Sequence, residues 1–161
     1  MLTKGAPLAT MKALFMLLNG GANTMTIAIR YFTKSKKGNT AKLAAAVSEA
    51  LGIEAQDVSS DLGEKVDRLF LINAMYAANI DKEVKAFLAR NKANIGEVVN
   101  MNTSASGSST WNIVKKVTDE LGIKLSEKEF HCAASWIFIN KGLPTAEDFE
   151  KAGKFAKELA E

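Results

Sequence analysis

The stretch FTKSKKGNT, residues 32–40, gathers hydrogen-bond donors at the point where an apolar run gives way to a helical pattern. Within nine residues it holds three lysines, a serine, two threonines, an asparagine and a glycine. If a strand precedes this loop and a helix follows it, the N–H groups of the opening helical turn point outward with the positive end of the helix dipole. Such a loop suits a phosphate group.

Other chemistries find less support among the residues. The nucleotide motifs GxxxxGK[ST] and GxGxxG do not occur, which weakens readings as a nucleoside triphosphate or dinucleotide site. The chain holds one histidine, His131, and one cysteine, Cys132, both in a strand-like run. With no second residue of either type to complete a metal or nucleophile site, we expect both to be structural and no metal to be bound.

Size and composition indicate one α/β domain that folds around a single good core. The chain has 161 residues, of which 47% are hydrophobic and 24% charged. Its net charge of +3 comes from basic residues mixed with acidic ones, so we expect no nucleic-acid partner and no membrane partner. A single cysteine excludes an internal disulfide and suits the reducing cytoplasm. We expect a cytoplasmic monomer or weak dimer.

The first 24 residues differ from the rest of the chain. Their apolar block, residues 13–18, is too short for a membrane span and short even for a signal-peptide core. A loosely attached extension, a secretion signal and a mis-assigned start remain open. In the last case Met25 is the true start, and Asn19-Gly20-Gly21 reflects a purine-rich ribosome-binding sequence. We therefore divide the chain into two parts. Residues 1–24 form an N-terminal extension that is either disordered or a mis-assigned start, and residues 25–161 form the domain.

Strand and helix patterns alternate from residue 26 onward. Strands are expected at 26–32, 54–58, 69–72, from 98–101 onward, and within FHCAASWIFI, residues 130–139. The helices carry apolar stripes made by Leu43, Val47, Ala50 and Leu51; by Val84, Phe87 and Leu88; by Ile113, Val114, Val117 and Leu121; and by Phe149, Ala152, Ala156 and Leu159. Gly52 and Gly122 are expected to end two of these helices, and Thr145 with Asp148 to cap the last.

This alternation predicts a parallel sheet with right-handed crossovers and helices on both faces, a three-layer α/β/α sandwich. In such sheets ligands bind beyond the carboxyl ends of the strands, where the strand order reverses. The loop 32–40 is expected at that place.

The segment SKKGNT, residues 35–40, followed by Lys42-Leu43-Ala44, resembles the S-x-x-G-N-T phosphate loop of flavodoxins. The resemblance continues through DRLFLINAMYAANID, the loop NTSASGSS and the EFHC strand, and covers residues 26–161. It implies a flavodoxin-like, doubly wound, five-stranded parallel sheet that holds FMN without a covalent bond. It also implies transfer of electrons between redox partner proteins. Because the alternating pattern begins at Thr26 and the earlier segment has no amphipathic stripe for docking, we expect residues 25–161 to suffice for folding and flavin binding.

The resemblance assigns a place to each residue of the expected binding site. Around the phosphate it places Ser35, Lys36, Lys37, Gly38, Asn39 and Thr40. Thr33, which stands where the family often has an aromatic, is expected to be a further cofactor-binding residue. Along the edge of the flavin ring it places Asn73, Ala74, Met75, Tyr76, Ala77, Ala78 and Asn79. On the other side of the ring it places Asn102, Thr103, Ser104 and Ala105. Tyr76 is either a neighbour of the flavin or a packed loop aromatic, and Trp111 either docks its helix or reaches the site.

The chain also departs from the family pattern. Lys36 and Lys37 stand where flavodoxins usually carry hydroxyls, and the chain lacks the strongly acidic character with which classical flavodoxins meet basic partners. Three functions therefore remain: an FMN electron carrier, a small FMN-dependent reductase linked to a quinone or NAD(P)H, and a cofactor-free interaction module. If the loop 73–79 needs a positive φ, we expect Asn79 to adopt it, or a rearrangement there to cost about 1 kcal/mol.

Overall fold

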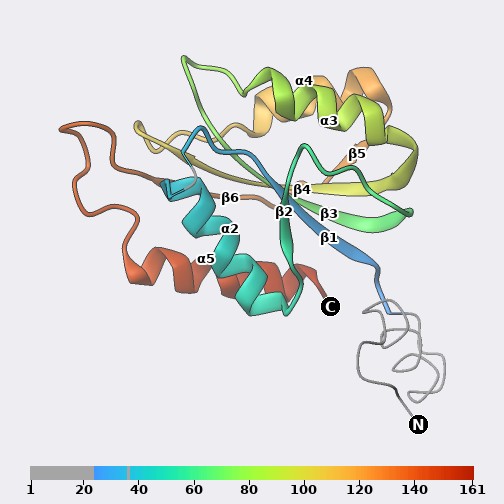
Figure 1. The fold of residues 1–161 in the computed structure, drawn as a ribbon, viewed down its shortest axis with the longest axis horizontal. Coiled ribbons are helices and arrows are strands. Elements are labelled where there is room, and N and C mark those ends of the chain that lie inside the picture. The colour runs from blue at the N-terminus through green and yellow to red at the C-terminus, as the bar shows by residue number, and fades with distance from the viewer. Residues whose placement is uncertain (1–23, 36) are drawn as a thin grey trace, which may run out of the picture.

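The computed structural model describes residues 24–35 and 37–161, so the expectations for residues 1–23 and for Lys36 lie outside the described part. The chain forms three layers (Figure 1). Helices α3 (Lys82–Asn91) and α4 (Trp111–Leu121) cover one face of a sheet, and α2 (Asn39–Leu51) and α5 (Ala146–Leu159) cover the other. The predicted α/β/α sandwich is confirmed.

All strands of the sheet run parallel in the order β2-β1-β3-β4-β5. Their bounds are Ile27–Tyr31 for β1, Ala55–Asp57 for β2, Val66–Ala74 for β3, Ile95–Ser104 for β4, Lys124–Leu125 for β5 and Phe130–Ala133 for β6. A short 3-10 helix, Lys92–Asn94, precedes β4. Both β5 and β6 pair with β4, β5 near its beginning and β6 at its end. They share one edge position, so the sheet has the five positions that were predicted.

The centre of the sheet explains the longest apolar run in the sequence. Leu69 and Leu71 of β3 point to the α3 and α4 face, whereas Phe70 and Ile72 point to the α2 and α5 face. All four are 0% exposed. A parallel strand between helical layers must be apolar on both sides, which produces a continuous run instead of an alternating one.

The predicted helix ends are confirmed by their caps. Gly52 follows α2 with φ 64° and its N–H donates to the carbonyl of Ser48, and Gly122 follows α4 with φ 71°. At the start of α5 the hydroxyl of Thr145 accepts from the Asp148 N–H, and the Asp148 carboxylate accepts from the Thr145 N–H. These local hydrogen bonds satisfy backbone groups that a helix leaves unpaired at its ends.

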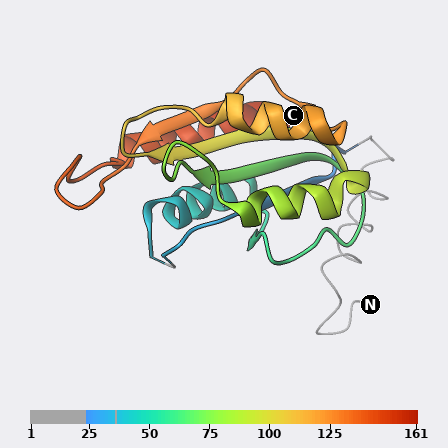
Figure 2. The ribbon, with the colours of Figure 1, turned by 90° about the horizontal axis from the view of Figure 1, so that it is seen from above.

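The last strand is shorter than FHCAASWIFI allows. The strand lies within that segment as predicted, but β6 ends at Ala133, which pairs with Ser104, the last residue of β4. Beyond Ser104 no neighbouring strand continues, so the following residues cannot extend the sheet. Instead the chain closes a tight turn in which Trp136 and Ile139 exchange backbone hydrogen bonds of 3.0 and 2.8 Å. Figure 2 shows this loop, in orange-red, projecting beyond the layers.

Within the described residues, no helix combines the length and apolar character needed to cross a membrane.

Gly96 tests the close packing of β3 against β4. A Cβ at this position would lie 2.6 Å from the backbone oxygen of Asp67, which cannot move without disturbing the sheet. We expect Gly96→Ala to lower the free energy of unfolding by about 1–3 kcal/mol. The matched control is Gly63→Ala, where a Cβ would meet no atom within 4 Å and the expected change is within about 0.5 kcal/mol. Urea denaturation measures both, and equal effects would contradict the packing argument.

Candidate functional site

The carboxyl ends of the strands bring four loops together at one edge of the sheet. These are the loops 32–38 after β1, 75–80 after β3, 105–110 after β4 and 134–145 after β6. From β1 the chain crosses to β2 on one side, and β3 then returns to the other side of β1. Because the connections leave in opposite directions, the crevice above β1 and β3 is the place where such sheets bind ligands. The loop 32–38 lies there, as predicted (Figure 1).

The loop after β1 is folded tightly on itself. The hydroxyl of Thr33 donates to the Ser35 carbonyl at 2.7 Å, and the Gly38 N–H donates to the same carbonyl at 2.9 Å. A Cβ at Gly38 would lie 3.1 Å from both the Ser35 oxygen and Thr33 Oγ1. Gly38 has an ordinary extended backbone, with φ −74°. Glycine therefore relieves a tight approach between this turn and the start of α2, and it does not supply an unusual φ.

The start of α2 leaves backbone donors for an anion. Its N-cap is Gly38, which has no side chain to accept a hydrogen bond, and its first turn holds no acidic residue. By contrast, Asp81 caps α3 and Thr145 caps α5 through their side chains. The N–H groups at the start of α2, together with the helix dipole, favour a negatively charged group at this point.

Two residues predicted to bind the phosphate, both at the start of α2, use their side chains for contacts with other parts of the chain. Thr40 is 3% exposed, and its Oγ1 lies 2.9 Å from Oγ1 of Thr103 in β4, with either hydroxyl able to donate. The Asn39 amide donates to Oγ of Ser135 at 3.1 Å. Because both side chains are already hydrogen-bonded, Asn39 and Thr40 would contact a ligand through their backbone N–H groups. The side chains of Ser35 and Lys37 are exposed beside them.

The loop after β3 closes through a two-residue turn. Tyr76 and Asn79 exchange backbone hydrogen bonds of 2.7 and 2.9 Å, and the residues between them, Ala77 and Ala78, have φ of 49° and 59°. Of the two alternatives expected for this loop, the one in which Asn79 adopts the positive φ is wrong, and the cost of a rearrangement stays a prediction. Because Asn79 pairs with Tyr76, the two residues between them must adopt the positive φ that a two-residue turn of this kind requires, and these residues are the two alanines.

Tyr76 links this turn to the loop after β1. Its hydroxyl accepts from the Lys34 N–H at 3.4 Å, and Nζ of Lys34 lies 4.4 Å from the centre of its ring. The aromatic is half-buried between the two loops that border the crevice. Its packing role is thus visible in the structure, and contact with a ligand stays a prediction.

A buried polar network holds the loop after β4. Thr110 Oγ1 donates to the Asn73 side-chain oxygen at 2.8 Å and accepts from the Asn100 amide at 3.0 Å. The Asn73 amide donates to the Asn100 side chain at 2.8 Å, and the Thr110 N–H donates to the Asn102 side chain at 3.0 Å. All four residues are 0% exposed. The side chains of Asn73 and Asn102 therefore face this network, and only their backbone can contribute to a ligand site.

The remaining predicted residues lie at the ends of β3 and β4. Ala74, Thr103 and Ser104 are buried, whereas Met75 and Ala105 are half-buried. The Met75 N–H donates to the Thr103 carbonyl at 3.1 Å, and the Ser104 hydroxyl donates to the Ser108 carbonyl at 2.9 Å. The residues predicted to lie beside the flavin ring are thus brought together at one edge of the sheet. This follows because β3 and β4 are parallel neighbours and end at the same edge.

Sequence reasoning missed Asn100 and Thr110 as parts of this edge. The pattern N-x-N at residues 100–102 places Asn100 and Asn102 on one face of a strand, which is a signal for shared polar partners. It also missed the turn at 136–139, because four consecutive apolar residues are typical of a strand.

Other singled-out residues have structural roles. Trp111 Nε1 donates to the Ser126 carbonyl at 2.8 Å and so docks α4, which is the first of the two alternatives given for it. A ring nitrogen of His131, Nδ1, lies 2.9 Å from the Gly107 carbonyl. Burial raises the pKa of the Cys132 thiol to about 11, so it stays protonated at neutral pH and is a poor nucleophile. In the described part of the chain, no three His, Cys, Asp or Glu side chains gather as a metal site.

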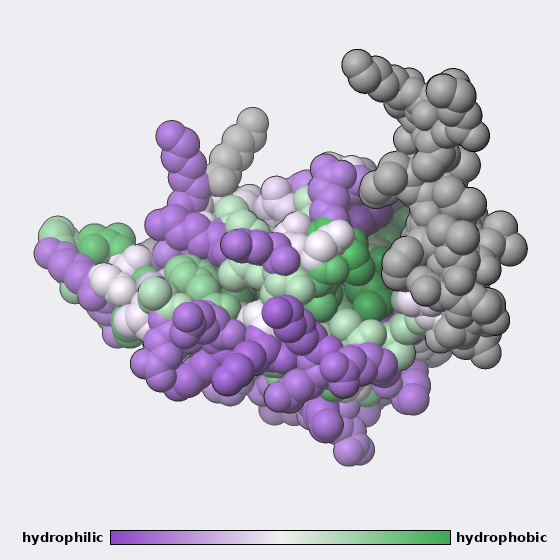
Figure 3. All heavy atoms as spheres, turned by 90° about the horizontal axis from the view of Figure 1, so that it is seen from below, coloured by the Kyte–Doolittle hydropathy of each residue, from purple (hydrophilic) through white to green (hydrophobic). Residues whose placement is uncertain are grey.

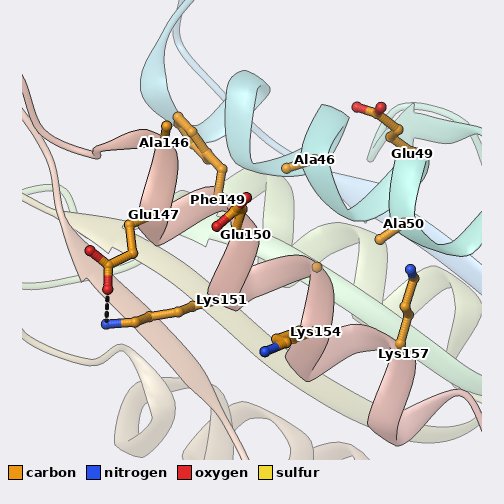
Figure 4. Close-up of a pocket in the computed structure, with 11 residues that line it drawn as sticks. Ala46, Glu49, Ala50, Ala146, Glu147, Phe149, Glu150, Lys151, Lys154 and Lys157 are labelled. Carbon is orange, nitrogen blue, oxygen red and sulfur yellow. Dashed lines mark ion pairs between the residues drawn. The ribbon is translucent and has the colours of Figure 1, made fainter.

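A groove of about 890 Å³ lies elsewhere, between α2 and α5 (Figure 4). Its base is formed by small or apolar residues such as Ala46, Ala50 and Phe149, and charged side chains stand along it. Figure 4 shows Glu147 and Lys151 paired with each other along α5 and not directed at a common point. The groove is open and lies on the outer surface of the helix pair, so size alone does not make it the preferred ligand site.

Comparison with known proteins decides the fold. No family model matches the chain, and no curated protein matches its sequence. A flavodoxin from the domain Archaea matches with a TM-score of 0.60 at 11% identity, over 84% of this chain and 96% of that one. Flavodoxin 1 from Bacillus cereus matches at 0.61 and 17% identity, over 82% and 95%. The chain has a flavodoxin-like fold.

A further similar structure is an enzyme. The apo form of an NADH:FMN oxidoreductase matches with a TM-score of 0.59 at 17% identity, over 85% of this chain and 89% of that one. The flavodoxin-like fold is thus shared by proteins with different activities, and the fold by itself leaves the activity open.

Thr110 tests the buried network. We expect Thr110→Val to lower the free energy of unfolding by about 2 kcal/mol or more, because Asn73 and Asn100 both lose a partner in a site without solvent. The control is Thr118→Val. Thr118 is equally buried, but its hydroxyl bonds only the Lys115 carbonyl in its own helix, and about 1 kcal/mol or less is expected. Urea denaturation of both variants is the measurement, and a smaller loss at Thr110 would contradict the assignment.

Ala78 tests the strained turn. Glycine has no Cβ to clash at positive φ, so we expect Ala78→Gly to stabilise the fold by roughly 0.5–1 kcal/mol after the greater flexibility of the unfolded chain is subtracted. Ala89→Gly, on the exposed side of α3, should instead destabilise by about 1 kcal/mol. Thermal melts of the two variants should therefore shift in opposite directions. A loss of stability at both positions would show that the turn is not strained.

Proposed function

We propose that this chain binds FMN non-covalently at the carboxyl edge of its sheet and carries electrons between redox partner proteins. The proposal is supported by the flavodoxin-like fold and by the loop 32–38 at the crevice between β1 and β3. When bound, the flavin supplies the redox chemistry, and the protein positions it and sets its surroundings.

The observation that carries this proposal is the geometry at Gly38. The absence of a Cβ lets the Thr33–Ser35 turn pack directly against the start of α2, because a methyl group here would lie 3.1 Å from the Ser35 oxygen and force the turn to shift. Backbone N–H groups, the exposed Ser35 hydroxyl and the positive end of the α2 dipole then serve one small anion. A phosphate monoester such as that of FMN matches this donor set, because charge-assisted hydrogen bonds from N–H groups are its strongest interactions.

The chain would hold the ring of FMN between the loops 75–80 and 105–110. The first presents Tyr76 and the exposed turn Ala77-Ala78, and the second is fixed by the Asn73, Asn100 and Thr110 network. Loops that are positioned by buried hydrogen bonds lose little freedom on binding, which favours affinity. Because the turn Ala77-Ala78 is itself exposed, a ring held against it would keep one edge accessible to a partner, as an electron carrier requires.

A small FMN-dependent reductase is the second candidate, and the similarity to an NADH:FMN oxidoreductase favours it. The two functions differ in whether the protein itself oxidises a nicotinamide. Incubation of the FMN-loaded chain with NADH or NADPH, with absorbance followed at the nicotinamide band, separates them. Steady consumption with a quinone as acceptor would support the reductase over the carrier.

The phosphate site is tested by comparing FMN with riboflavin, which lacks the phosphate. We expect FMN to bind far more tightly, because each charge-assisted hydrogen bond contributes about 1.5–3 kcal/mol. Gly38→Ala should reduce this preference by roughly tenfold, since the loop must shift by a few tenths of an ångström. Affinity for riboflavin itself should change little. Quenching of flavin fluorescence measures all of these affinities.

Gly63→Ala is the matched control, because its Cβ would enter open space at the opposite end of the sheet. Its affinities for both flavins should equal those of the parent. If the parent protein binds FMN and riboflavin equally, the loop 32–38 is not a phosphate site. If it binds neither, the proposal fails and the cofactor-free interaction module is supported.

A further inference from the structure

The turn after β6 exposes four consecutive large apolar side chains. Trp136 is 59% exposed, Ile137 66%, Phe138 83% and Ile139 49%. We call residues 135–140 the apolar hairpin. In Figure 3 hydrophobic surface gathers at the projecting left end of the molecule, next to hydrophilic side chains. Exposed apolar groups are common singly, but a contiguous group on a projecting turn marks an interaction site.

The apolar hairpin is held to the loops of the proposed FMN site. Its first residue, Ser135, accepts from the Asn39 amide at the start of α2, next to the loop after β1, and its N–H donates to the Leu143 carbonyl at 3.0 Å. Its last residue, Asn140, donates through its amide to the Ala105 carbonyl in the loop after β4. Whatever docks on the hairpin is therefore placed beside the crevice between β1 and β3.

The loops around the apolar hairpin carry lysines and no carboxylates. The four loops at this edge, 32–38, 75–80, 105–110 and 134–145, contain Lys34, Lys36, Lys37 and Lys141 but no Asp or Glu, although the chain has 18 acidic residues. Lys141 lies over the ring of Phe138, with Nζ 5.6 Å from its centre. Such a surface attracts an anionic partner and repels a cationic one.

The acidic side chains that border these loops keep their negative charge, but each is oriented by a contact within the chain. Glu129 accepts from the Ser109 hydroxyl at 2.8 Å in the loop 105–110 and lies 3.6 Å from Nε2 of His131. Asp81 accepts from the Glu83 N–H at the start of α3, and Asp148 accepts from the Thr145 N–H at the start of α5. Glu147 pairs with Lys151 at 3.1 Å.

The size of the apolar hairpin indicates which kind of protein complex it can form. Four apolar side chains on one turn are too few for the roughly 1,600 Å² of a stable interface, and two copies of a cationic rim would repel each other. Electron-transfer encounters bury less than about 1,200 Å² and use a small apolar centre within a charged rim. We propose that the apolar hairpin and the lysines around it dock an acidic electron-transfer protein. The electron-transfer part of this inference rests on the proposed function.

The test uses a plant-type [2Fe–2S] ferredoxin as the acidic probe and cytochrome c as the basic one. Binding to the full chain is measured by calorimetry, with and without FMN, at low and at physiological ionic strength. We expect micromolar binding of ferredoxin that weakens about tenfold or more with salt, and no binding of cytochrome c. Phe138→Ser should weaken ferredoxin binding at least tenfold, because exposed aromatics at the centre of an interface carry much of its affinity.

Two charge variants are matched to each other. Lys141→Glu should weaken ferredoxin binding several-fold and permit binding of cytochrome c. Lys65→Glu, an exposed lysine at the opposite edge of the sheet, should leave both unchanged. None of the three variants should alter the affinity for FMN, and their melting temperatures should match that of the parent.

The outcomes separate this inference from the proposed function. Docking of ferredoxin by a chain that does not bind FMN would support the surface and reject the electron carrier. FMN binding with no ferredoxin binding, or with binding unchanged in Phe138→Ser, would overturn the docking proposal. It would also be overturned if the hairpin instead drives binding to phosphatidylserine vesicles, or a dimer that Phe138→Ser abolishes in analytical ultracentrifugation.

Discussion

Parallel pairing of β3 with β4 is the constraint on which the rest of the structure depends. The two strands stay in register from Val66 opposite Ile95 to Ala74 opposite Thr103, and their central residues are fully buried. Because parallel strands cannot be joined by a tight hairpin, α2, α3 and α4 cross over the faces of the sheet between strands, and α5 follows the last strand. These four helices supply the two halves of the core. The common direction of the strands places all the loops that follow the strands at one edge, where the candidate site is built.

The polar network at the end of β3 and β4 shows how that edge is made specific. Buried amides cost free energy unless their hydrogen bonds are formed, so Asn73, Asn100 and Thr110 are compatible with only one placement of the loop after β4. An apolar filling of the same space would hold the strands together without fixing the loop. Thr40 with Thr103, and Asn39 with Ser135, extend this locking to the start of α2.

Fold and surface charge carry different information about this protein. The sheet order and the crossover at β1 create the crevice at which sheets of this kind bind ligands, and the fold is shared with flavodoxins of low sequence identity. The charge of the loops at that edge determines which macromolecules can approach, and here the loops carry lysines without carboxylates. A phosphate and an acidic protein would both be attracted to this edge, the first by backbone donors within the crevice and the second by side chains around it.

Much of the fold was predictable because its signals are local. The continuous apolar run at 69–72, the glycines that end α2 and α4, the Thr145 and Asp148 box, and the SKKGNT loop each act within a few residues of chain. The candidate site was predictable only as a set of loops. Periodicity places Asn73 and Asn102 on a face of a strand, but their partners come from residues up to 37 positions away, so only the tertiary structure decides that these side chains turn inward. Likewise, the strand at 130–139 stops at Ala133 because its neighbour β4 ends, and the two alanines adopt positive φ because the chain must return to Tyr76. Those decisions depend on what lies opposite, which no short stretch of sequence contains.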